Sequence, residues 1–407
     1  MDQRIIFHID VNSAYLSWES VDRLSKDPDA VDLRTIPAAV GGDQKKRHGI
    51  ILAKSEQAKQ YGVRTGEPIL KALEKCPTLT IVPPHHSLYE QCSQDFMNIL
   101  REYTPIVEKF SVDEAYCDMT ESLRKDDDPF FVACMIKDRI YRELKFTVNI
   151  GVAPNKLLAK MASDFQKPNR VHTLFRNEIP KKLWPLPVRD LYFVGGATEQ
   201  KLSNLGIHTI EELAHADPKV LKSHFKKQGE VIYAYANGYD DNPVCGTGHQ
   251  YKGYGNSTTV SFDVEDTDTA KLIIRSLCET VGARLRKDHM SASVIVIEIK
   301  NNDFIRYSHQ CTLLSPTNAT NQIYEAASAL FDEVWDGSPI RLLGVRSTKL
   351  SKDETRQLNL FDLEQYDKMA KLDSAIDKIR NKYGENAVMR ASFLEENRIH
   401  PMTGKKK

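Results

Sequence analysis

The stretch that most constrains the fold is Ser111-Val112-Asp113-Glu114-Ala115-Tyr116, in which two adjacent carboxylates stand among apolar and aromatic residues. Apolar segments on both sides of it predict two short strands joined by a tight turn at Asp113 and Glu114. Neighbouring side chains at a turn can reach one place, whereas on a strand they point to opposite faces. Two acids in apolar surroundings are costly unless a positive group meets them. Two Mg²⁺ ions carrying a triphosphate would do so, and the alternative is a solvated Asp-Glu turn.

A third carboxylate lies near the start of the sequence. The segment from Arg4 to Asp10 is typical of a buried strand that ends in an acid, and the chain then turns into an amphipathic helix that runs through Leu24. An acid at the carboxyl end of a first strand is a common ligand position in open α/β sheets. The alternative is that Asp10 is the N-cap of the helix. Together, Asp10, Asp113 and Glu114 offer three carboxylates for a two-metal site.

Composition limits the class of protein. The 407 residues suggest about two to four domains, and contents of 41% hydrophobic and 28% charged residues are typical of a soluble globular protein. The seven dispersed cysteines contain no C-x-x-C pair, which favours a reducing cytosol without a disulfide framework or zinc site. We find no run of eighteen apolar residues and no secretory leader, so we expect a cytoplasmic protein without a membrane span.

Charge is unevenly distributed along the chain. The formal net charge is zero, which by itself does not indicate a nucleic-acid-binding protein. Between Lys145 and Lys182, however, eight Lys and Arg residues face only two acids, Asp164 and Glu178. A local basic strip of this kind can attract a phosphate backbone even when the whole chain is neutral.

Three motifs carry a family resemblance: IDVNSAY from Ile9, SVDEAY from Ser111 and NIGVAPNKLLAKMASDFQKP from Asn149. In this order and spacing they resemble the Y-family translesion DNA polymerases, above all the bacterial polymerase IV-like and polymerase V catalytic-subunit-like members. The resemblance covers residues 4 to about 350. It implies template-directed addition of deoxynucleotides to a primer 3′-OH, with low fidelity, in DNA repair and damage tolerance. The expected partners are primed template DNA and deoxynucleoside triphosphates, and we expect a monomer associated with the bacterial nucleoid.

The expected fold is α+β, a multidomain right-hand polymerase. Strands mixed with helices in the first half favour an α+β palm over a doubly wound sheet. A β-α-β-β-α-β order after residue 253 is the split βαβ arrangement, which matches the little finger of the family. The expected domains are the palm (1–20 and 81–172), fingers (21–80), a thumb with a helix-hairpin-helix (173–240), a linker (241–252), the little finger (253–350) and a tail (351–407).

The resemblance assigns the metal ligands. Two Mg²⁺ ions per active site would clamp the phosphates of the incoming nucleotide and the primer 3′-oxygen. Asp10 and Asp113 would bridge the ions and Glu114 would complete the site of the catalytic one. The carbonyl oxygen of Val11 could add a further ligand.

The same resemblance assigns the nucleotide site. Tyr15 would be the steric gate, with its ring beneath the deoxyribose so that a 2′-hydroxyl cannot fit; the alternative is a core aromatic residue on an amphipathic helix. Lys167, in Gln-Lys-Pro, matches the lysine that contacts the triphosphate. The other expected nucleotide-binding residues are Ser13, Ala14 and Lys59.

The fingers depart from the family pattern. Many members have a Tyr and an Arg on the helix that faces the phosphates, where this chain has Glu56 and Lys59. Lysine replaces the charge but not the bidentate fork of arginine, and glutamate repels phosphate. Either Lys54 or another basic residue compensates, or catalysis is slow. Small residues near the expected templating base, Ala53 and Ser55 among them, would leave room for damaged bases.

The thumb would contact DNA through Gly195, Gly196 and Thr198. A glycine hairpin between two short helices exposes backbone N–H groups that hold a phosphate without reading sequence. The family usually has a glycine before the valine of this hairpin, where this chain has Phe193. The alternative interpretation is a simple turn.

The tail contains Gln357-Leu358-Asn359-Leu360-Phe361. Apolar residues in an exposed linker are anomalous unless something covers them. The pentapeptide resembles the bacterial sliding-clamp peptide, with Gln357 as the hydrogen-bonding residue and Leu358, Leu360 and Phe361 as apolar contacts; the alternative is a patch that folds back on its own domain. A helix with apolar residues at helical spacing follows as far as Tyr383, without an assigned function.

Two other functions are compatible with parts of the sequence. A nucleotide cyclase can be built on a similar palm, but about 250 residues with thumb-like and little-finger-like patterns follow the palm. A catalytically silent scaffold that binds DNA and the clamp is the second alternative. The presence of all three carboxylates argues against it, whereas Glu56 argues for it.

Overall fold

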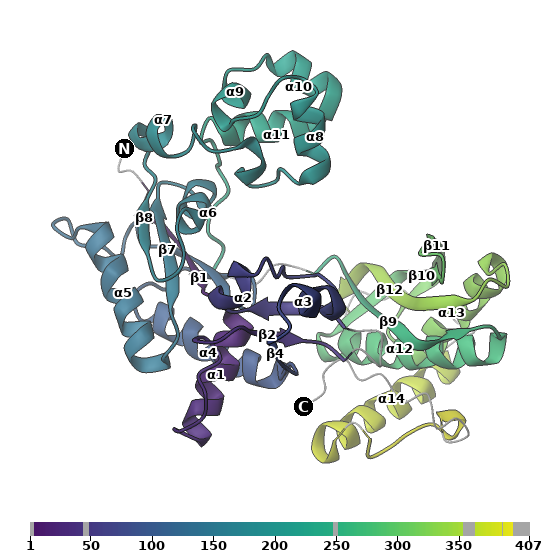
Figure 1. Ribbon diagram of the computed structural model, residues 1–407. Coiled ribbons are helices and arrows are strands. Elements are labelled where there is room, and N and C mark those ends of the chain that lie inside the picture. The colour runs from purple at the N-terminus through teal and green to yellow at the C-terminus, as the bar shows by residue number, and fades with distance from the viewer. Residues whose placement is uncertain (1–3, 44–48, 247–250, 353–362, 385, 394–407) are drawn as a thin grey trace. The chain divides into compact units, whose positions relative to one another are not determined.

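The computed structural model describes residues 4–43, 49–246, 251–352, 363–384 and 386–393 (Figure 1). The chain forms two compact units, the first over residues 1–41 and 51–249 and the second over 42–50 and 250–407. Among the described helices, none is long and apolar enough to cross a membrane.

A five-stranded sheet is the centre of the first unit. In spatial order its strands are β5 (Val107–Lys109), β6 (Glu114–Asp118), β1 (Ile6–Val11), β7 (Val148–Ala153) and β8 (Val171–Thr173). β1 is antiparallel to both β6 and β7, and all six of its residues are buried. The sequence therefore predicted this strand correctly, with an error of one or two residues at each end.

Four helices accompany this sheet, namely α1 (Ala14–Lys26), α4 (His86–Arg101), α5 (Pro129–Leu144) and α6 (Lys156–Asp164). Side chains on β1 alternate between its two faces, as they must on a strand. Phe7, Ile9 and Val11 belong to the core formed with α1, α4 and α5. Ile6 belongs instead to a core that contains the apolar residues of α6. Asp10 is in step with Ile6, so its side chain points to the side of the sheet on which α6 lies.

Gly151 of β7 allows α6 to lie close to the sheet. A Cβ atom added at this position would be 2.5 Å from the backbone nitrogen of Ser163 and would also collide with the carbonyl oxygen of Ala159. Because glycine has no Cβ atom, the backbone of the helix can rest on the strand. The side chain of Asn155 caps α6 by accepting a hydrogen bond from the Leu158 N–H (2.8 Å), which fixes where the helix begins.

A three-stranded sheet in the order β3-β2-β4 forms a separate small core in the same unit. Its elements are β2 (Ala38–Gly41), β3 (Ile51–Lys54), β4 (Thr80–Val82), α2 (Glu56–Gln60) and α3 (Ile69–Lys75). Ser55 caps α2 by accepting from the Ala58 N–H and is buried. Its hydroxyl is therefore used within the protein and does not contribute the open space that we expected it to leave beside a templating base.

The remaining part of the first unit consists of short helices. They are α7 (Ile179–Lys182), α8 (Gly196–Ser203), α9 (Ile210–Ala214), α10 (Pro218–Phe225) and α11 (Lys227–Ala236), with 3₁₀ turns at Arg176–Glu178 and Val188–Asp190. Their apolar residues join the core beneath α6. The residue before the Val194-Gly195-Gly196 turn, Phe193, has a left-handed backbone with φ of 72°, a conformation that favours glycine.

The second unit contains a four-stranded antiparallel sheet in the order β11-β10-β12-β9. Along the chain its elements are β9 (Gly253–Val264), α12 (Thr267–Lys287), β10 (Met290–Asn301), β11 (Arg306–Thr317), α13 (Thr320–Val334) and β12 (Ile340–Lys352). This confirms the predicted β-α-β-β-α-β order. The apolar residues of α12 and α13 pack with those of the strands in one core. A further helix, α14 (Leu363–Tyr383), contacts α12, and a 3₁₀ turn follows at Ala391–Phe393.

Candidate active site

The turn that follows β1 separates Asp10 from the start of α1. Ser13 precedes α1 with φ of 46° and ψ of 48°, makes no side-chain capping bond and is exposed. The hydroxyl of Ser17 donates to the carbonyl of Asn12 (2.6 Å) and holds this turn. Asp10 is therefore a residue of the strand and not a helix cap, which rules out that alternative interpretation.

The turn that precedes β6 holds Asp113 beside the end of β1. The N–H groups of Phe110 and Ser111 donate to the carbonyl of Glu114 (3.0 and 3.1 Å), and the N–H of Val11 donates to the carbonyl of Asp113 (3.0 Å). The turn therefore spans residues 110–113, and Glu114 is the first residue of β6. We had expected the turn one residue later. The hydrogen bond from Val11 decides its position, and that bond comes from a strand far away in the sequence.

Asp10 and Glu114 form a cross-strand pair. They are opposite each other in the register of β1 and β6, and their carboxyl groups hydrogen-bond. Lys160 Nζ lies 2.6 Å from Glu114 Oε1 and 3.4 Å from Asp10 Oδ2. Lys167 Nζ lies 3.0 Å from Asp10 Oδ1. Asp164 forms ion pairs with Lys160 (3.4 Å) and Lys167 (2.8 Å). Three carboxylates and two ammonium groups therefore form one network, which we call the β1–α6 network.

The pKa values of this network move in opposite directions. Burial favours the neutral form of Asp10, but the Lys167 and Lys160 ammonium groups outweigh it and hold the pKa of Asp10 below its usual value. Burial and the hydrogen bond with Asp10 raise the pKa of Glu114 to about 7, although Lys160 opposes this. Asp10 is thus the carboxylate that stays ionised, whereas Glu114 holds a proton more readily.

His8 lies on the same face of β1 as Asp10. Burial, followed by the charge of Lys160, lowers the pKa of His8 well below its usual value, so the ring is neutral. Its Nδ1 atom is 2.8 Å from the hydroxyl of Ser163, which also donates to the Lys160 carbonyl (2.8 Å). The neutral ring therefore fills the space between β1 and α6 without adding charge to the network.

Lys160 and Asp164 are residues that the sequence analysis did not assign. They lie four residues apart, so they share one face of α6. The helix follows β7, which is antiparallel to β1, and this topology brings its inner face to the carboxylates. The i, i+4 Lys-Asp spacing on a predicted helix next to the catalytic strand was the available signal.

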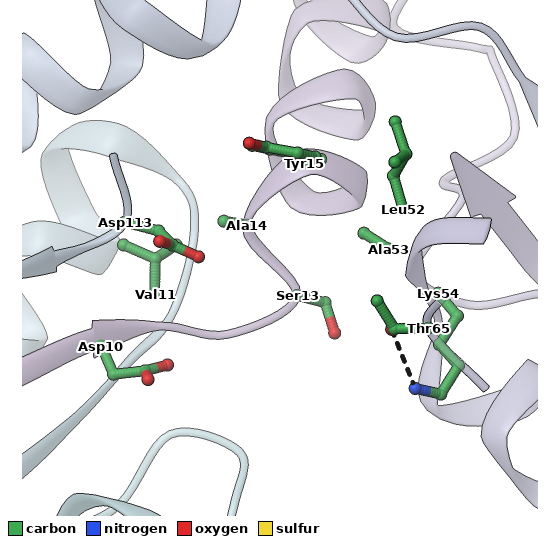
Figure 2. Close-up of a pocket in the computed structure, with 10 residues that line it drawn as sticks. All are labelled: Asp10, Val11, Ser13, Ala14, Tyr15, Leu52, Ala53, Lys54, Thr65 and Asp113. Carbon is green, nitrogen blue, oxygen red and sulfur yellow. Dashed lines mark hydrogen bonds between the residues drawn. The ribbon is translucent and has the colours of Figure 1, made fainter. Parts of the chain in front are cut away.

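A pocket of about 380 Å³ opens beside this network (Figure 2). Its lining residues are Asp10, Val11, Ser13, Ala14, Tyr15, Leu52, Ala53, Lys54, Thr65 and Asp113. In Figure 2 the two carboxylates lie on one side and Lys54 with Thr65 on the other, with residues 13–15 between them. One wall can thus bind cations and the opposite wall can bind an anion.

The ring of Tyr15 is supported from behind. It stacks on Tyr89 with 4.3 Å between ring centroids and an angle of 9° between the rings. The Tyr89 hydroxyl donates to the buried carboxylate of Glu19. Burial and the nearby Asp113 carboxylate raise the pKa of Tyr15, so the phenol is uncharged. Tyr15 is half-buried, packs against the core and also lines the pocket.

Comparison with known proteins gives three matches to protein-family models. The impB/mucB/samB family matches residues 9–164, the IMS family HHH motif matches 176–207, and the impB/mucB/samB family C-terminal domain matches 251–360. The chain is 43% identical over 393 residues to DNA polymerase IV of Clostridium acetobutylicum, covering 97% of this chain and 99% of the relative. It is 38% identical over 396 residues to DNA polymerase IV 1 of Bacillus subtilis, covering 97% and 94%. The chain belongs to the Y family of translesion DNA polymerases.

A solved structure supports the same fold. A Y-family DNA polymerase chimera, Dbh-Dpo4(243-245)-Dbh, matches with a TM-score of 0.75 and 23% identity, covering 85% of this chain and 98% of the chimera. The predictions of the family, of the mixed α+β polymerase fold with its helix-hairpin-helix motif and little finger, and of a translesion DNA polymerase are confirmed. The nucleotide cyclase and silent-scaffold alternatives are therefore set aside.

The metal ligands of this Y-family polymerase were predicted as Asp10, Val11, Asp113 and Glu114. Relatives of the DNA polymerase IV type typically use Mg²⁺. Carboxylate and carbonyl oxygens are the ligands that Mg²⁺ prefers, so this donor set fits the ion. In the part of the chain that is described, no three His, Cys, Asp or Glu side chains already converge in a metal-binding arrangement. Lys160 and Lys167 hold two of the carboxylates instead, so an ion would have to displace ammonium groups.

Of the two lysines of the fingers that could bind phosphate, Lys54 lines the pocket and Lys59 does not. Lys59 is exposed, forms an ion pair with Glu56 (3.4 Å) and does not line the pocket. Lys54 does line it, with Nζ 3.4 Å from the Thr65 hydroxyl, and burial lowers its pKa. Glu56, which we expected from sequence to repel phosphate, thus forms an ion pair with Lys59, and Lys54 is the better-positioned cation.

The predicted DNA-binding residues of the thumb lie at the start of α8. Gly195 is its N-cap, and the Thr198 N–H donates to the Gly195 carbonyl (2.9 Å). A Cβ atom added at Gly195 or Gly196 would meet nothing within 4 Å, so both glycines border open space. The predicted clamp-binding residues, Gln357 to Phe361, lie outside the described residues.

Proposed function

We propose that Asp10, Asp113 and Glu114 are the carboxylates of a two-Mg²⁺ site at which this polymerase joins a deoxynucleotide to a primer. The observation that supports this most is the direct pairing of Asp10 with Glu114 across β1 and β6, at the wall of a pocket that Asp113 also lines. Two ions held there would activate the primer 3′-oxygen and stabilise the departing pyrophosphate. The Val11 carbonyl is the proposed fourth ligand.

The lysines of the β1–α6 network have two proposed roles. Before metal and nucleotide bind, Lys160 and Lys167 neutralise carboxylates that would otherwise repel one another inside the protein. If Asp10 and Glu114 held cations, both ammonium groups would lose these two partners and keep Asp164. Lys167, which is 30% exposed, can then reach the triphosphate, whereas Lys160 is 12% exposed and stays near Glu114. Lys54 on the opposite wall, and Lys59 outside the pocket once Glu56 releases it, are the proposed phosphate contacts.

Tyr15 is the proposed steric gate, with Ser13 and Ala14 as the backbone that borders the nucleotide. Its stacking on Tyr89 supports this role, because a ring that is held from behind cannot move aside for a 2′-hydroxyl. Tyr15→Ala should raise the use of ribonucleotides relative to deoxynucleotides in primer extension. An unchanged ratio would mean that the ring only fills space.

The proposed domain boundaries are those given by the sequence: palm 1–20 and 81–172, fingers 21–80, thumb 173–240, linker 241–252, little finger 253–350 and tail 351–407. In the thumb, Gly195, Gly196 and Thr198 would hold a phosphate of the duplex without reading its sequence. Their position at the start of α8, beside open space, supports this proposal.

Primer extension with Mg²⁺ tests the metal site. Asp113→Asn keeps the shape of the side chain and the Ser111 hydroxyl as a neighbour, but it removes the charge that a metal needs. We expect extension to fall about a thousandfold, because a lost metal ligand removes several kcal/mol of transition-state stabilisation. The matched control is Asp118→Asn, at the other end of β6. Near-native extension by Asp113→Asn, with primed template still bound, would overturn the assignment.

The sliding clamp is the proposed partner of Gln357 to Phe361, on the evidence of the sequence alone. A tether to a ring around the duplex would raise the local concentration of the polymerase at the primer end. Replacing Leu360 and Phe361 together by Ala should abolish binding to the clamp and clamp-stimulated synthesis but leave unassisted extension unchanged. Unaltered affinity in a titration with clamp would place the contact elsewhere in the chain.

A further inference from the structure

α14 has an apolar row of side chains that is exposed and a pair of charged side chains that faces the protein. Leu372, Ile379 and Tyr383 follow one another at spacings of seven and four residues, so they share a face of the helix. They are 53%, 39% and 67% exposed. Asp373 and Arg380, seven residues apart on a different face, point toward the body of the unit. A surface helix ordinarily turns its apolar stripe to the core. In this helix Met369 and Ile376 are half-buried on the face of Asp373 and Arg380, whereas the second apolar row, Leu372, Ile379 and Tyr383, is exposed.

Buried ion pairs fix that orientation. Arg286 of α12 donates to Asp373 (3.1 Å) and to both oxygens of Asp377 (2.6 and 3.0 Å). Asp373, only 5% exposed, also accepts from the Thr320 N–H in the first turn of α13 (2.8 Å). Arg380 donates to Glu279 of α12 (2.9 Å), which is 8% exposed. We call these contacts the α14 anchor.

The α14 anchor prevents the helix from turning its apolar stripe inward. A rotation that buried Leu372 and Ile379 would pull Asp373 away from Arg286 and leave buried charges without partners, which is more costly than the apolar burial would gain. Arginine forks also demand one geometry from their carboxylates. The exposed apolar stripe is therefore a permanent feature of this surface.

The exposed face is positively charged. Lys371, Lys378 and Lys382 each come directly before a residue of the apolar stripe and are exposed. The described side chains of α14 include two carboxylates, Asp373 and Asp377, and both are held by Arg286 on the opposite side. Among the described ion pairs, none involves these three lysines. One face of the helix thus combines a row of apolar side chains with a row of ammonium groups that pair with none of the described carboxylates.

We propose that this outer face of α14, made of Lys371, Leu372, Lys378, Ile379, Lys382 and Tyr383, is a docking surface for an acidic amphipathic segment of another protein. Apolar side chains of the partner would cover the Leu372, Ile379 and Tyr383 stripe, and its carboxylates would pair with the lysines. The face lies in the second unit, whereas every predicted catalytic residue belongs to the first.

Charge decides between the possible occupants. A second copy of this chain would bring lysines against lysines in a symmetric contact, because the same patch faces itself. A nucleic acid would pair with the lysines but would leave three large apolar side chains uncovered. An anionic membrane takes up both kinds of side chain, but stable attachment needs a larger apolar face than three residues on a fixed helix. An acidic amphipathic partner satisfies both rows.

The test uses the full chain and a fluorescent peptide of about eighteen residues, with leucines at helical spacing separated by glutamates. We expect saturable binding, measured by anisotropy, that weakens at least tenfold in Lys378→Glu and in Ile379→Ser. The charge-matched control is Lys287→Glu, an exposed lysine of α12, which should bind like the native chain. Thermal unfolding and unassisted primer extension should be unchanged in all three variants, because the altered side chains are exposed.

Three outcomes would overturn the proposal. The first is no binding of the peptide at any accessible concentration. The second is equal weakening by Lys287→Glu and Lys378→Glu, which would mean general attraction between opposite charges. The third is a loss of binding to anionic vesicles or to duplex DNA in Ile379→Ser that exceeds its loss of peptide binding, which would assign the face to a membrane or to nucleic acid instead.

Discussion

The β1–α6 network and the α14 anchor are two buried sets of ion pairs in one chain, and they are built from different cations. In the first, lysines neutralise Asp10, Glu114 and Asp164. In the second, arginines hold Asp373, Asp377 and Glu279. An ammonium group is a single point charge on a flexible stem, whereas a guanidinium group is a planar fork that fixes its partner. The lysine network can release its carboxylates, and the arginine network cannot.

The two networks also treat like charges differently. In the β1–α6 network, Asp10 and Glu114 touch each other and share Lys160, and burial together with the hydrogen bond to Asp10 raises the pKa of Glu114 to about 7. In the α14 anchor, Glu279 receives an arginine from α14 and a second from Arg390 (2.7 Å). In the β1–α6 network two lysines thus serve three carboxylates, whereas in the α14 anchor, with Arg390 included, three arginines serve three.

The largest expected effect separates the two networks by activity. Glu114→Gln should lower the rate of primer extension about a thousandfold, because it removes a proposed metal ligand. Glu279→Gln is the matched change in the α14 anchor and should leave the rate within about twofold of native. Single-turnover extension with Mg²⁺ measures both. A large loss of rate in Glu279→Gln would mean that the α14 anchor also contributes to catalysis, which contradicts the proposed difference between the two networks.

The next effect separates them by stability. Arg286→Met should destabilise the second unit by about 3 kcal/mol, because it leaves Asp373 buried without its arginine. Chemical denaturation measures this, with or without Mg²⁺, and added Mg²⁺ should not restore the loss. Arg286→Lys is the control and should recover only part of the stability, since lysine lacks the fork. Full recovery by lysine would mean that charge alone holds α14.

A third prediction concerns the competition between lysine and metal. Lys160→Met should make Mg²⁺ bind about tenfold more tightly to the DNA-free protein, because the ion no longer displaces an ammonium group from Glu114 and Asp10. Titration calorimetry measures the affinity. Lys156→Met, which removes a lysine from the same helix that pairs with Glu108 (2.7 Å), is the control and should have little effect. An unchanged affinity in Lys160→Met would show that the lysine and the ions occupy separate places.

The smallest effect is a pH dependence. The raised pKa of Glu114, about 7, means that this carboxyl is mostly protonated below that pH in the metal-free protein. An ion binds the ionised form, so the apparent Mg²⁺ affinity should rise about threefold or more from pH 6 to pH 8 and then level off.

The contribution of Glu114 to the stability of the metal-free fold has the opposite dependence on pH. It is fully present below its ordinary pKa of 4.5 and is lost as the pH rises through 7. The Glu114→Gln protein should lack the stability trend.

The sequence predicted the elements of the catalytic sheet because their signals are local. Apolar runs identified β1 and the two strands of the β5–β6 hairpin. Asp10 and Asp113 were chosen from the same runs and Tyr15 from the family resemblance, and the structure brings all three to one pocket. The positions of the two carboxylates depend mainly on where a strand ends, which a single sequence reveals.

Features that depend on contacts between distant segments were not predicted. The turn before Glu114 is one residue earlier than expected because Val11 donates to Asp113 across the sheet. Lys160 was counted only as part of a basic strip, because its partners lie on two strands far away in the sequence. The apolar periodicity of α14 was recognised, but its outward orientation depends on Arg286 of another helix.

The missing side chain of Gly151 has a consequence for how this enzyme can vary. The backbone of α6 rests where a methyl group at 151 would be, so even Gly151→Ala must push the helix away from the strand. Lys160 and Asp164 would then move together as one rigid body, and the spacing between the catalytic acids and their cations would change everywhere at once. The absence of a side chain at Gly151 thus fixes the distance between α6 and β7. Even a methyl group at this position should disturb the active site more than most substitutions on the surface of the enzyme.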